Sequence, residues 1–458
     1  MPFDIAGLLA ERAGEGYALQ SRYVNAQVPR MLHAIGFDKV FTRAEGAHYW
    51  DADGNRYLDM LAGFGVHAVG RNHPVVRQAL HTVLDAGLAD MLQFDAPLLM
   101  GLLAEQLVAR APGMERVYFC NSGGEAIEAA LKFARGATGR PRVLYCDHAY
   151  HGLTAGALSV NGAKEFRRGF GPLLPDTMIR FGNLDDLARE LRKGDVAALL
   201  VEPIQGKGVN VAPDGFLRDA RELLHAHGAL LIADEVQTGL GRTGRFFAHS
   251  YDGVQPDIVT VAKALSGGFV PVGATLMAPG VFEKVYSGID RVFVHASTFM
   301  GNALAMTAGL ATLAVLDDEQ LVANALARGD ELMAGLRAIA AEQPTIADVR
   351  GRGLMVGIEF GKPPTMSGKA IWSTLNTARK GLFAQLVVVP LFTRHRILTQ
   401  VAGDYMPVIK LIPPLCITSA DVQEFLAAFA DVMTGAEKPS GLALGFGRTL
   451  VKQALDRG

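Results

Sequence analysis

Two acids and one lysine stand directly after two apolar runs, and these residue types can do chemistry together. Residues 229–233 (ALLIA) precede Asp234 and Glu235, and residues 258–262 (IVTVA) precede Lys263. Continuous apolar runs are typical of parallel strands that are covered on both faces. Because ligands of open α/β sheets bind beyond the carboxyl ends of the strands, we expect a carboxylate and an amine to share one crevice.

The chemistry of such a pair is specific. A buried lysine loses its proton readily and can then form a Schiff base with a carbonyl group. An aspartate directed at a pyridine nitrogen keeps that nitrogen protonated, which makes the ring an electron sink. Asp234 and Lys263 therefore predict the floor of a pyridoxal 5′-phosphate site.

A glycine pair between a strand and a helix predicts a second part of this site. Residues 121–126 (NSGGEA) follow the apolar run VYFC and open the helical pattern AIEAALKFARG. Backbone N–H groups of Gly123 and Gly124 would point outward at the positive end of a helix dipole, which is a cradle for a phosphate group. The alternative is an ordinary tight turn between a strand and a helix.

Composition and charge limit the classes of function. Half of the 458 residues are apolar, a fifth are charged, and 52 are glycine, as in globular α/β proteins. The formal net charge is 44 − 46 = −2, and no long run of one sign occurs, so we expect no nucleic-acid partner.

Cysteine spacing and hydropathy bear on location. Cys120, Cys146 and Cys416 lie far apart, with neither metal-ligand spacing nor a disulfide framework, which favours a reducing cytoplasm and no metal site. The N-terminal residues lack the basic start and apolar centre of a signal peptide. The apolar run 382–392 contains Gln385 and Pro390 and is too short for a membrane span. We therefore expect a cytoplasmic protein without a membrane span.

The pattern of the chain predicts an α/β fold with a mostly parallel central sheet and helices on both faces, because short apolar runs alternate with helical patterns. A long helical region, 303–341, follows. The expected division is an N-terminal segment (1–75) that contributes to the small domain, a large cofactor-binding domain (76–330), a smaller α+β domain (331–435) and a C-terminal extension (436–458). The apolar runs are Val117–Cys120, Val143–Cys146, Ala197–Val201, Leu230–Ala233, Ile258–Val261 and Ala274–Met277.

Six motifs in fixed order carry a resemblance to a known family. From about Phe41 to Met433 the chain resembles the class III pyridoxal phosphate-dependent aminotransferases of fold type I. That group contains ornithine, acetylornithine, putrescine and other ω-amino-acid or amine aminotransferases. The motifs are NSGGEA (121–126), YHG (150–152), EPIQG (202–206), DEVQTGLGRTG (234–244), PDIVTVAKALSGG (256–268) and HASTFMGN (295–302).

The resemblance implies roles for the residues around the cofactor ring. Lys263 would hold the cofactor and move a proton between the substrate carbon and the cofactor. Asp234 would pair with the pyridinium nitrogen through a charge-assisted hydrogen bond. Gln237 would hydrogen-bond the phenolic oxygen, Glu202 would orient the other polar groups, and Tyr150 would stack on the ring.

The resemblance also implies a phosphate site that is shared between two subunits. Ser122, Gly123 and Gly124 would bind the phosphate group, joined by Thr298 of the partner subunit in a homodimer. His151 is ambiguous, because it would either support the stacked ring or only line the wall.

Two lysines depart from the pattern of the ornithine-type relatives. Those relatives carry Glu at the position of Lys207 and Arg at the position of Lys410. There the Arg holds the α-carboxylate of the acceptor, and the Glu pairs with the Arg when it is not needed. Lysine offers a point charge in place of the planar fork of arginine, so this switch cannot operate here. The alternative is that both lysines are surface groups.

The sequence therefore predicts an aminotransferase that moves an amino group between a primary amine or aldehyde and a small oxo acid or amino acid. A bulky, apolar amine would fit, with Lys410 binding the carboxylate of the small co-substrate. The alternatives are an ornithine- or acetylornithine-type enzyme and a decarboxylase, racemase or aminomutase of the same fold. A non-catalytic protein that kept the fold is a further alternative.

Overall fold

The computed structural model describes residues 3–92, 95–362, 372, 382–403 and 405–436. From residue 437 on, the predicted C-terminal extension lies outside the described residues.

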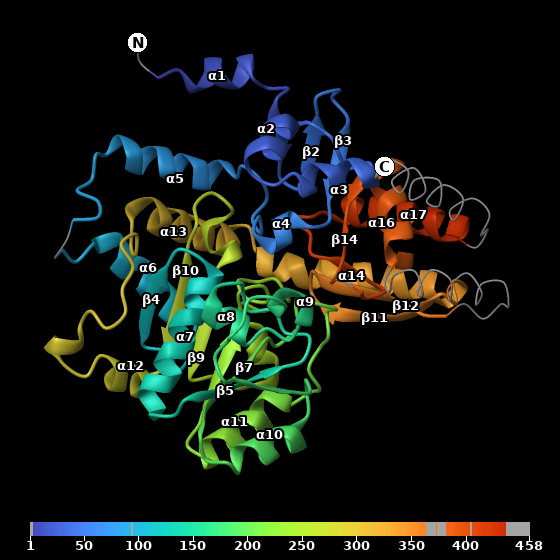
Figure 1. Cartoon of the computed structure of the whole chain (residues 1–458). Coiled ribbons are helices and arrows are strands. Elements are labelled where there is room, and N and C mark those ends of the chain that lie inside the picture. Colours follow the sequence, from blue (N-terminus) through green and yellow to red (C-terminus); the bar gives the residue numbers. More distant parts are fainter. Residues whose placement is uncertain (1–2, 93–94, 363–371, 373–381, 404, 437–458) are drawn as a thin grey trace.

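A seven-stranded sheet forms the centre of the molecule (Figure 1), in the order β4-β10-β9-β8-β7-β5-β6. Of these strands, β10 runs antiparallel to β4 and β9, whereas β5 to β9 pair in parallel. The predicted α/β class is confirmed, and each of the six apolar runs lies in a strand. The short strand β6 was not predicted. The strands are β4 (Arg116–Cys120), β5 (Arg142–Cys146), β6 (Thr177–Ile179), β7 (Val196–Val201), β8 (Leu230–Asp234), β9 (Ile258–Val261) and β10 (Gly273–Met277).

Helices cover both faces of this sheet because its strands are apolar on both sides. Tyr118 and Cys120 of β4 pack in the cluster that contains α7, while Phe119 packs in the cluster that contains α6 and α13. Figure 1 shows α7 in front of the strands and α10 and α11 at the lower end. The helices are α5 (Pro74–Asp85), α6 (Leu98–Ala109), α7 (Gly123–Thr138), α8 (Ala155–Ser159), α9 (Lys164–Arg167), α10 (Leu184–Leu191), α11 (Phe216–Ala226), α12 (Pro279–Val285) and α13 (Ala303–Asp318).

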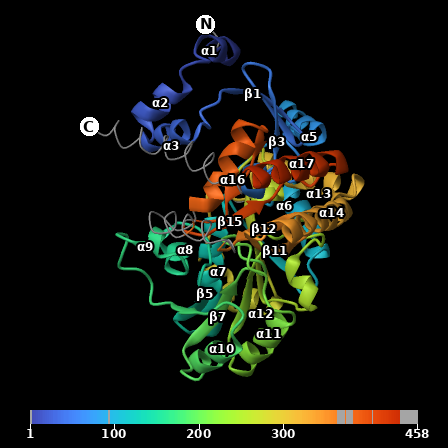
Figure 2. The same cartoon turned by 90° about the vertical axis from the view of Figure 1, so that its right-hand side faces the viewer.

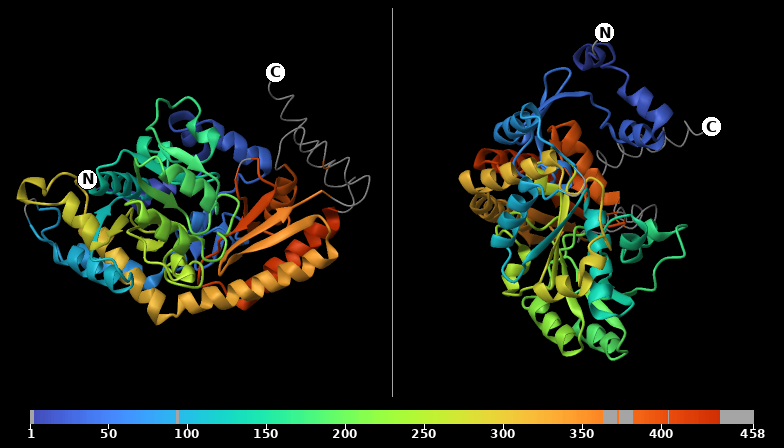
Figure 3. Two further views of the ribbon diagram at one scale, coloured as in Figure 1. Left: turned by 90° about the horizontal axis from the view of Figure 1, so that it is seen from below. Right: turned by 90° about the vertical axis from the view of Figure 1, so that its left-hand side faces the viewer.

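The predicted helical region 303–341 is two helices. Helix α13 ends at Asp318, and α14 (Leu321–Glu342) begins after Gln320, whose φ of 52° lies in the left-handed region. In Figure 3 (left) α14 runs along one side of the molecule towards the second sheet. Helix α14 packs on α13, beside the large sheet, and also on β11 and α17 (Ser419–Ala436). It therefore connects the large sheet with the C-terminal part of the chain.

Two four-stranded sheets lie beside the large sheet. One has the order β11-β12-β15-β14, and the other, β1-β2-β3-β13, contains strands from both ends of the chain. Helix α16 (Leu382–Thr393) continues through Pro390 and packs on α17 (Figure 2). The strands are β1 (Phe41–Glu45), β2 (His48–Asp51), β3 (Arg56–Asp59), β11 (Ile346–Arg352), β12 (Met355–Phe360), β13 (Ile397–Leu398), β14 (Gln400–Val401) and β15 (Val408–Leu411).

The first three helices lie apart from the sheets at one end of the molecule (Figure 2). None of the residues of α1 (Ile5–Glu11), α2 (Gly16–Tyr23) and α3 (Gln27–Ile35) is buried. Within the described part of the chain, no helix combines the length and apolarity needed to cross a membrane.

Candidate active site

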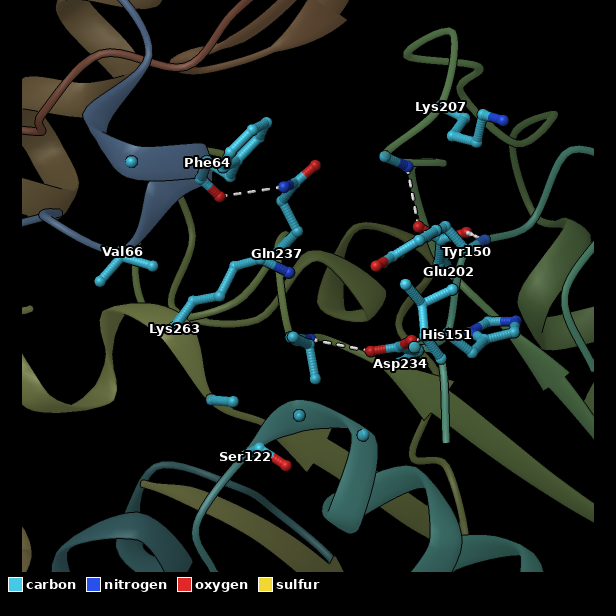
Figure 4. Close-up of a pocket in the computed structure, with 18 of the residues that line it drawn as sticks. Phe64, Val66, Ser122, Tyr150, His151, Glu202, Lys207, Asp234, Gln237 and Lys263 are labelled. Atoms are coloured by element: carbon cyan, nitrogen blue, oxygen red, sulfur yellow. Dashed lines mark hydrogen bonds and ion pairs between the residues drawn. The ribbon is translucent and has the colours of Figure 1, made fainter. Parts of the chain in front are cut away.

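A cavity of about 1270 Å³ lies at the carboxyl ends of β7, β8 and β9, between the large sheet and β15. Figure 4 shows ten of the residues that line this cavity with labels. Predicted site residues from six separate segments meet here. They are Ser122, Gly123, Gly124, Tyr150, His151, Glu202, Lys207, Asp234, Gln237, Lys263 and Lys410.

Asp234 is the last residue of β8, and three donors hold its carboxylate. Oδ1 accepts hydrogen bonds from the backbone N–H of Val236 (3.0 Å) and from Oγ1 of Thr260 (3.2 Å) on neighbouring β9. Oδ2 lies 2.6 Å from Nδ1 of His151, so this ring nitrogen carries the proton. A carboxylate has about four acceptor positions. Among the described residues, one position on Oδ2 therefore has no donor.

Lys263 opens a short turn, η2 (Lys263–Ser266), directly after β9. Its φ of 39° is unusual for a residue with a side chain, and such a conformation costs about 1–3 kcal/mol. Burial lowers the pKa of Lys263, although the negative charges of Asp234 and Glu202 act in the opposite direction. The lowered pKa favours the neutral amine, which is the nucleophilic form.

The start of α7 forms the lower end of the cavity in Figure 4, where Ser122 is labelled. Ser122 is the N-cap, and its Oγ accepts a hydrogen bond from the backbone N–H of Glu125 at 3.1 Å. The N–H groups of Gly123 and Gly124 belong to the first helical turn, where no intrahelical acceptor exists. A Cβ atom on Gly123 would lie 3.0 Å from Val236, so the helix approaches the turn after β8 closely only without a side chain.

Glu202 also lines the cavity and binds two backbone groups of its wall. Its two carboxylate oxygens accept hydrogen bonds from the backbone N–H groups of Gly206 (2.8 Å) and Tyr150 (3.0 Å). Burial raises the pKa of Glu202. A Cβ atom on Gly206 would lie 2.8 Å from Oε1 of Gln237, so a side chain at this position would displace the amide of Gln237. Glu202 thus holds the backbone of Tyr150 and of Gly206.

Lys410 comes from β15 and is buried, with 5 % of its surface exposed. Its ammonium group donates to the backbone oxygen of Gly206 (2.8 Å) and to Oε1 of Gln237 (3.2 Å). The amide nitrogen of Gln237 donates to the backbone oxygen of Phe64 at 3.0 Å. Burial lowers the pKa of Lys410 to about 7, and the positive charge of Lys263 acts in the same direction. The two hydrogen-bond partners of Lys410 are neutral oxygens, and the negative charge of Glu202 offsets the effect of burial on the pKa of this lysine only in part.

Lys207 is buried as well, with 8 % of its surface exposed, but its charge is compensated. Its Nζ forms an ion pair with Glu165 of α9 and lies 4.8 Å from the centre of the ring of Phe166. The interpretation of Lys207 and Lys410 as surface groups is therefore wrong.

Residues 33–433 of the chain match the sequence model described as aminotransferase class-III. The chain belongs to the class III aminotransferase family. It is 37% identical, over 445 aligned residues, to aminotransferase PigE of Serratia sp. (strain ATCC 39006), an alignment that covers 90% of this chain. The chain spans about half (52%) of the length of that relative.

Solved structures agree with this family. The ornithine aminotransferase of Toxoplasma gondii ME49 is 32% identical, with a TM-score of 0.81 over 94% of this chain and 97% of that chain. An amine transaminase from an uncultivated Pseudomonas species, solved in a PLP-bound form, is 30% identical, with a TM-score of 0.75 over 86% and 94% of the two chains. The fold-type-I architecture predicted from the motifs is thereby confirmed.

Thr298 is the one predicted site residue that does not line the cavity of this single chain. It is exposed, and so are Phe299 beside it and Ile289 near it. The segment lies close to the start of α7, because Asn121 Nδ2 donates to Oγ of Ser297 at 2.9 Å. The assignment of Thr298 to the site of a partner subunit stays a prediction.

Sequence reasoning did not find several residues of the cavity. Phe64 lies in a left-handed turn (φ 63°), and Phe166 lies on the four-residue helix α9, where no periodic pattern exists. Thr260 does not line the cavity but holds Asp234, and in the sequence it is only one residue of an apolar run. Its role follows from the register that places it beside Asp234, which the sequence does not display.

Proposed function

We propose that the chain is a pyridoxal 5′-phosphate-dependent aminotransferase that exchanges an amino group between a primary amine and a small oxo acid. The observation that carries this proposal is the open acceptor position of Asp234 across the cavity from Lys263. A protonated pyridine nitrogen fits that position as a charged donor. The first turn of α7 suits the phosphate group. Class III aminotransferases depend on this cofactor, and the residues present fit it.

When bound, pyridoxal phosphate supplies the electron sink for the carbon that loses its proton. Nζ of Lys263 would hold the cofactor in the resting enzyme, and once released it would serve as the base. It would take the proton from the substrate carbon that bears the nitrogen and deliver it to the cofactor. Asp234 keeps its charge next to the ring nitrogen, and His151 holds Oδ2 of Asp234 in place.

Lys410 is proposed to bind the carboxylate of the oxo acid. Lys410 lines the cavity and its ammonium group hydrogen-bonds two neutral oxygens, so the carboxylate of an oxo acid would add a direct anionic partner. Apolar side chains form much of the remaining lining, which suits a bulky, apolar amine or aldehyde. These side chains are Phe64, Val66, Tyr150, Phe166, Phe269, Val270 and Val401.

We further propose that the enzyme is a cytoplasmic homodimer in which Thr298 completes the phosphate site of the partner subunit. The exposed position of Thr298 beside the apolar side chain of Phe299, which is 59% exposed, supports this arrangement.

A single half-reaction tests the proposed function. The cofactor-loaded enzyme is mixed with a panel of amines, diamines and α-amino acids without any acceptor, and the visible absorption of the cofactor is followed. We expect stoichiometric conversion to pyridoxamine phosphate by simple amines. Release of carbon dioxide or racemised amino acid without pyridoxamine phosphate would instead favour a decarboxylase or racemase. Rapid conversion by ornithine and none by simple amines would favour the ornithine-type alternative.

A further inference from the structure

Lys207 and Lys410 both line the cavity, but their surroundings differ in charge. Among the described residues, Lys410 donates hydrogen bonds to the neutral oxygens of Gly206 and Gln237, whereas Lys207 is paired with the carboxylate of Glu165. Burial raises the pKa of the Glu165 carboxyl group, but the hydrogen bond and charge of Lys207 outweigh it, and the pKa is lowered overall. Glu165 is therefore a stable anion at neutral pH.

Glu165 compensates Lys207 from outside the cavity. Phe166 and Lys207 belong to the lining, and Glu165 does not. The ring of Phe166 lies against Nζ of Lys207 and packs edge-on against the ring of Tyr150, with 5.5 Å between the ring centres. A Cβ atom on Gly403 would lie 2.8 Å from Cε of Lys207, so the stem of this lysine is confined. A substrate meets aromatic rings and a neutralised lysine on this side.

We propose that Glu165, Phe166 and Lys207 form a charge-masked wall that makes the enzyme select amine donors whose far end is uncharged. This inference rests on the proposed function, and it extends it from the reaction to the class of donor. An ω-amino acid that extends towards this wall, and not towards Lys410, would place its carboxylate beside a lysine that already has an anionic partner. The carboxylate would then lose its hydration without gaining a free cation, which is unfavourable. An alkylamine of the same length carries no such cost.

Removal of the masking charge is the sharpest test. In Glu165→Gln the shape of the side chain is kept, but Lys207 becomes an uncompensated cation at the cavity wall. We expect the ratio of kcat/KM for an ω-amino acid to that for the alkylamine of equal carbon number to rise at least tenfold. The panel runs from β-alanine and propylamine to 6-aminohexanoate and hexylamine, because the best length is set by the distance to Lys263.

Three further variants separate masking from other effects. The double variant Glu165→Gln/Lys207→Met lacks both charges and is expected to return to the ratio of the unchanged enzyme. Lys207→Met alone leaves the carboxylate of Glu165 without its lysine partner, so we expect this ratio to fall through charge repulsion. Glu424→Gln breaks an exposed ion pair with Arg56 outside the cavity and serves as the matched control.

An unchanged ratio in Glu165→Gln, or an equal rise in the double variant, would contradict the proposed charge-masked wall. So would a selective loss of ω-amino acid activity in the double variant, since Lys207 would then be a carboxylate receptor. If no amine reacts with the unchanged enzyme, the proposed function fails. Dissociation constants of the same pairs of compounds, measured by calorimetry on the cofactor-loaded protein, then test the wall separately.

Discussion

The floor and the side wall of the cavity are built on different kinds of structure. Asp234 and Lys263 lie at the ends of adjacent strands in the middle of the large sheet. The backbone N–H of Val236 and the side chains of His151 and Thr260 hold the carboxylate of Asp234. Lys207 lies in a loop and is held by the charge of Glu165 on a four-residue helix. We infer that the floor sets which reaction occurs and the wall sets which substrate reacts, so changes to the floor should reduce rate and changes to the wall should alter selectivity.

Replacement of Lys263 tests the floor most directly. We expect Lys263→Ala to lose at least about 10³-fold in kcat, because one variant removes both the attachment point and the proton-moving base. Steady-state rates with a simple amine and pyruvate measure this loss. Lys193→Ala, at an exposed lysine, is the control. A Lys263→Ala enzyme with the native rate and native cofactor binding would refute the whole assignment.

Asp234→Asn keeps the shape of the side chain but removes its charge. The expected loss in kcat is about 10²-fold, the order found when one preorganised electrostatic group is removed from a site. The measurement is kcat at saturating cofactor, so that weakened cofactor binding does not contribute. A rate within twofold of the unchanged enzyme would show that the charge of Asp234 does not support the reaction.

The proposed role of Lys410 in binding the oxo acid is tested through pH. The pKa of about 7 for Lys410 means that the ammonium form, which binds a carboxylate, dominates below pH 7 and declines above it. We therefore expect the KM for the oxo acid to rise about tenfold per pH unit above about pH 7. Lys410→Arg should remove this rise, because arginine keeps its proton. Lys410→Met should raise that KM about 10–100-fold at pH 7, as expected for the loss of a charged hydrogen bond.

The KM for the amine provides the internal control for Lys410. The far end of the amine is uncharged, so its binding should not depend on the protonation of Lys410. Equal pH profiles of the unchanged enzyme and Lys410→Arg would contradict the assignment of the carboxylate to Lys410.

The difference between floor and wall also explains what the sequence could predict. Asp234, Lys263 and Gly123 follow or precede apolar runs, so the topology of a parallel sheet alone brings them together. The pair Glu165–Lys207 joins residues 42 positions apart, through a helix too short to show a period. Similarly, the φ of 39° at Lys263 depends on the packing around the strand end and leaves no signal in the sequence.

Loss of the hydrogen bond from Thr260 to Asp234 is expected to have the smallest effect on kcat among these variants. Thr260→Val keeps a β-branched side chain in β9 but removes the donor to Oδ1 of Asp234. One such hydrogen bond contributes about 1 kcal/mol, so we expect a decrease of about fivefold in kcat, with the amine KM little changed.

Thr275→Val is the matched control for this variant. Thr275 lies opposite Thr260 on β10, is equally buried, and donates its hydroxyl to the backbone oxygen of Ala126 at 2.9 Å, away from Asp234. Both variants lose one buried hydrogen bond in the same sheet, so both should lower the thermal unfolding temperature by similar amounts. If kcat falls equally in both, Thr260 acts only through the stability of the sheet. A fall confined to Thr260→Val would mean that the floor depends on how the carboxylate of Asp234 is held as well as on its charge.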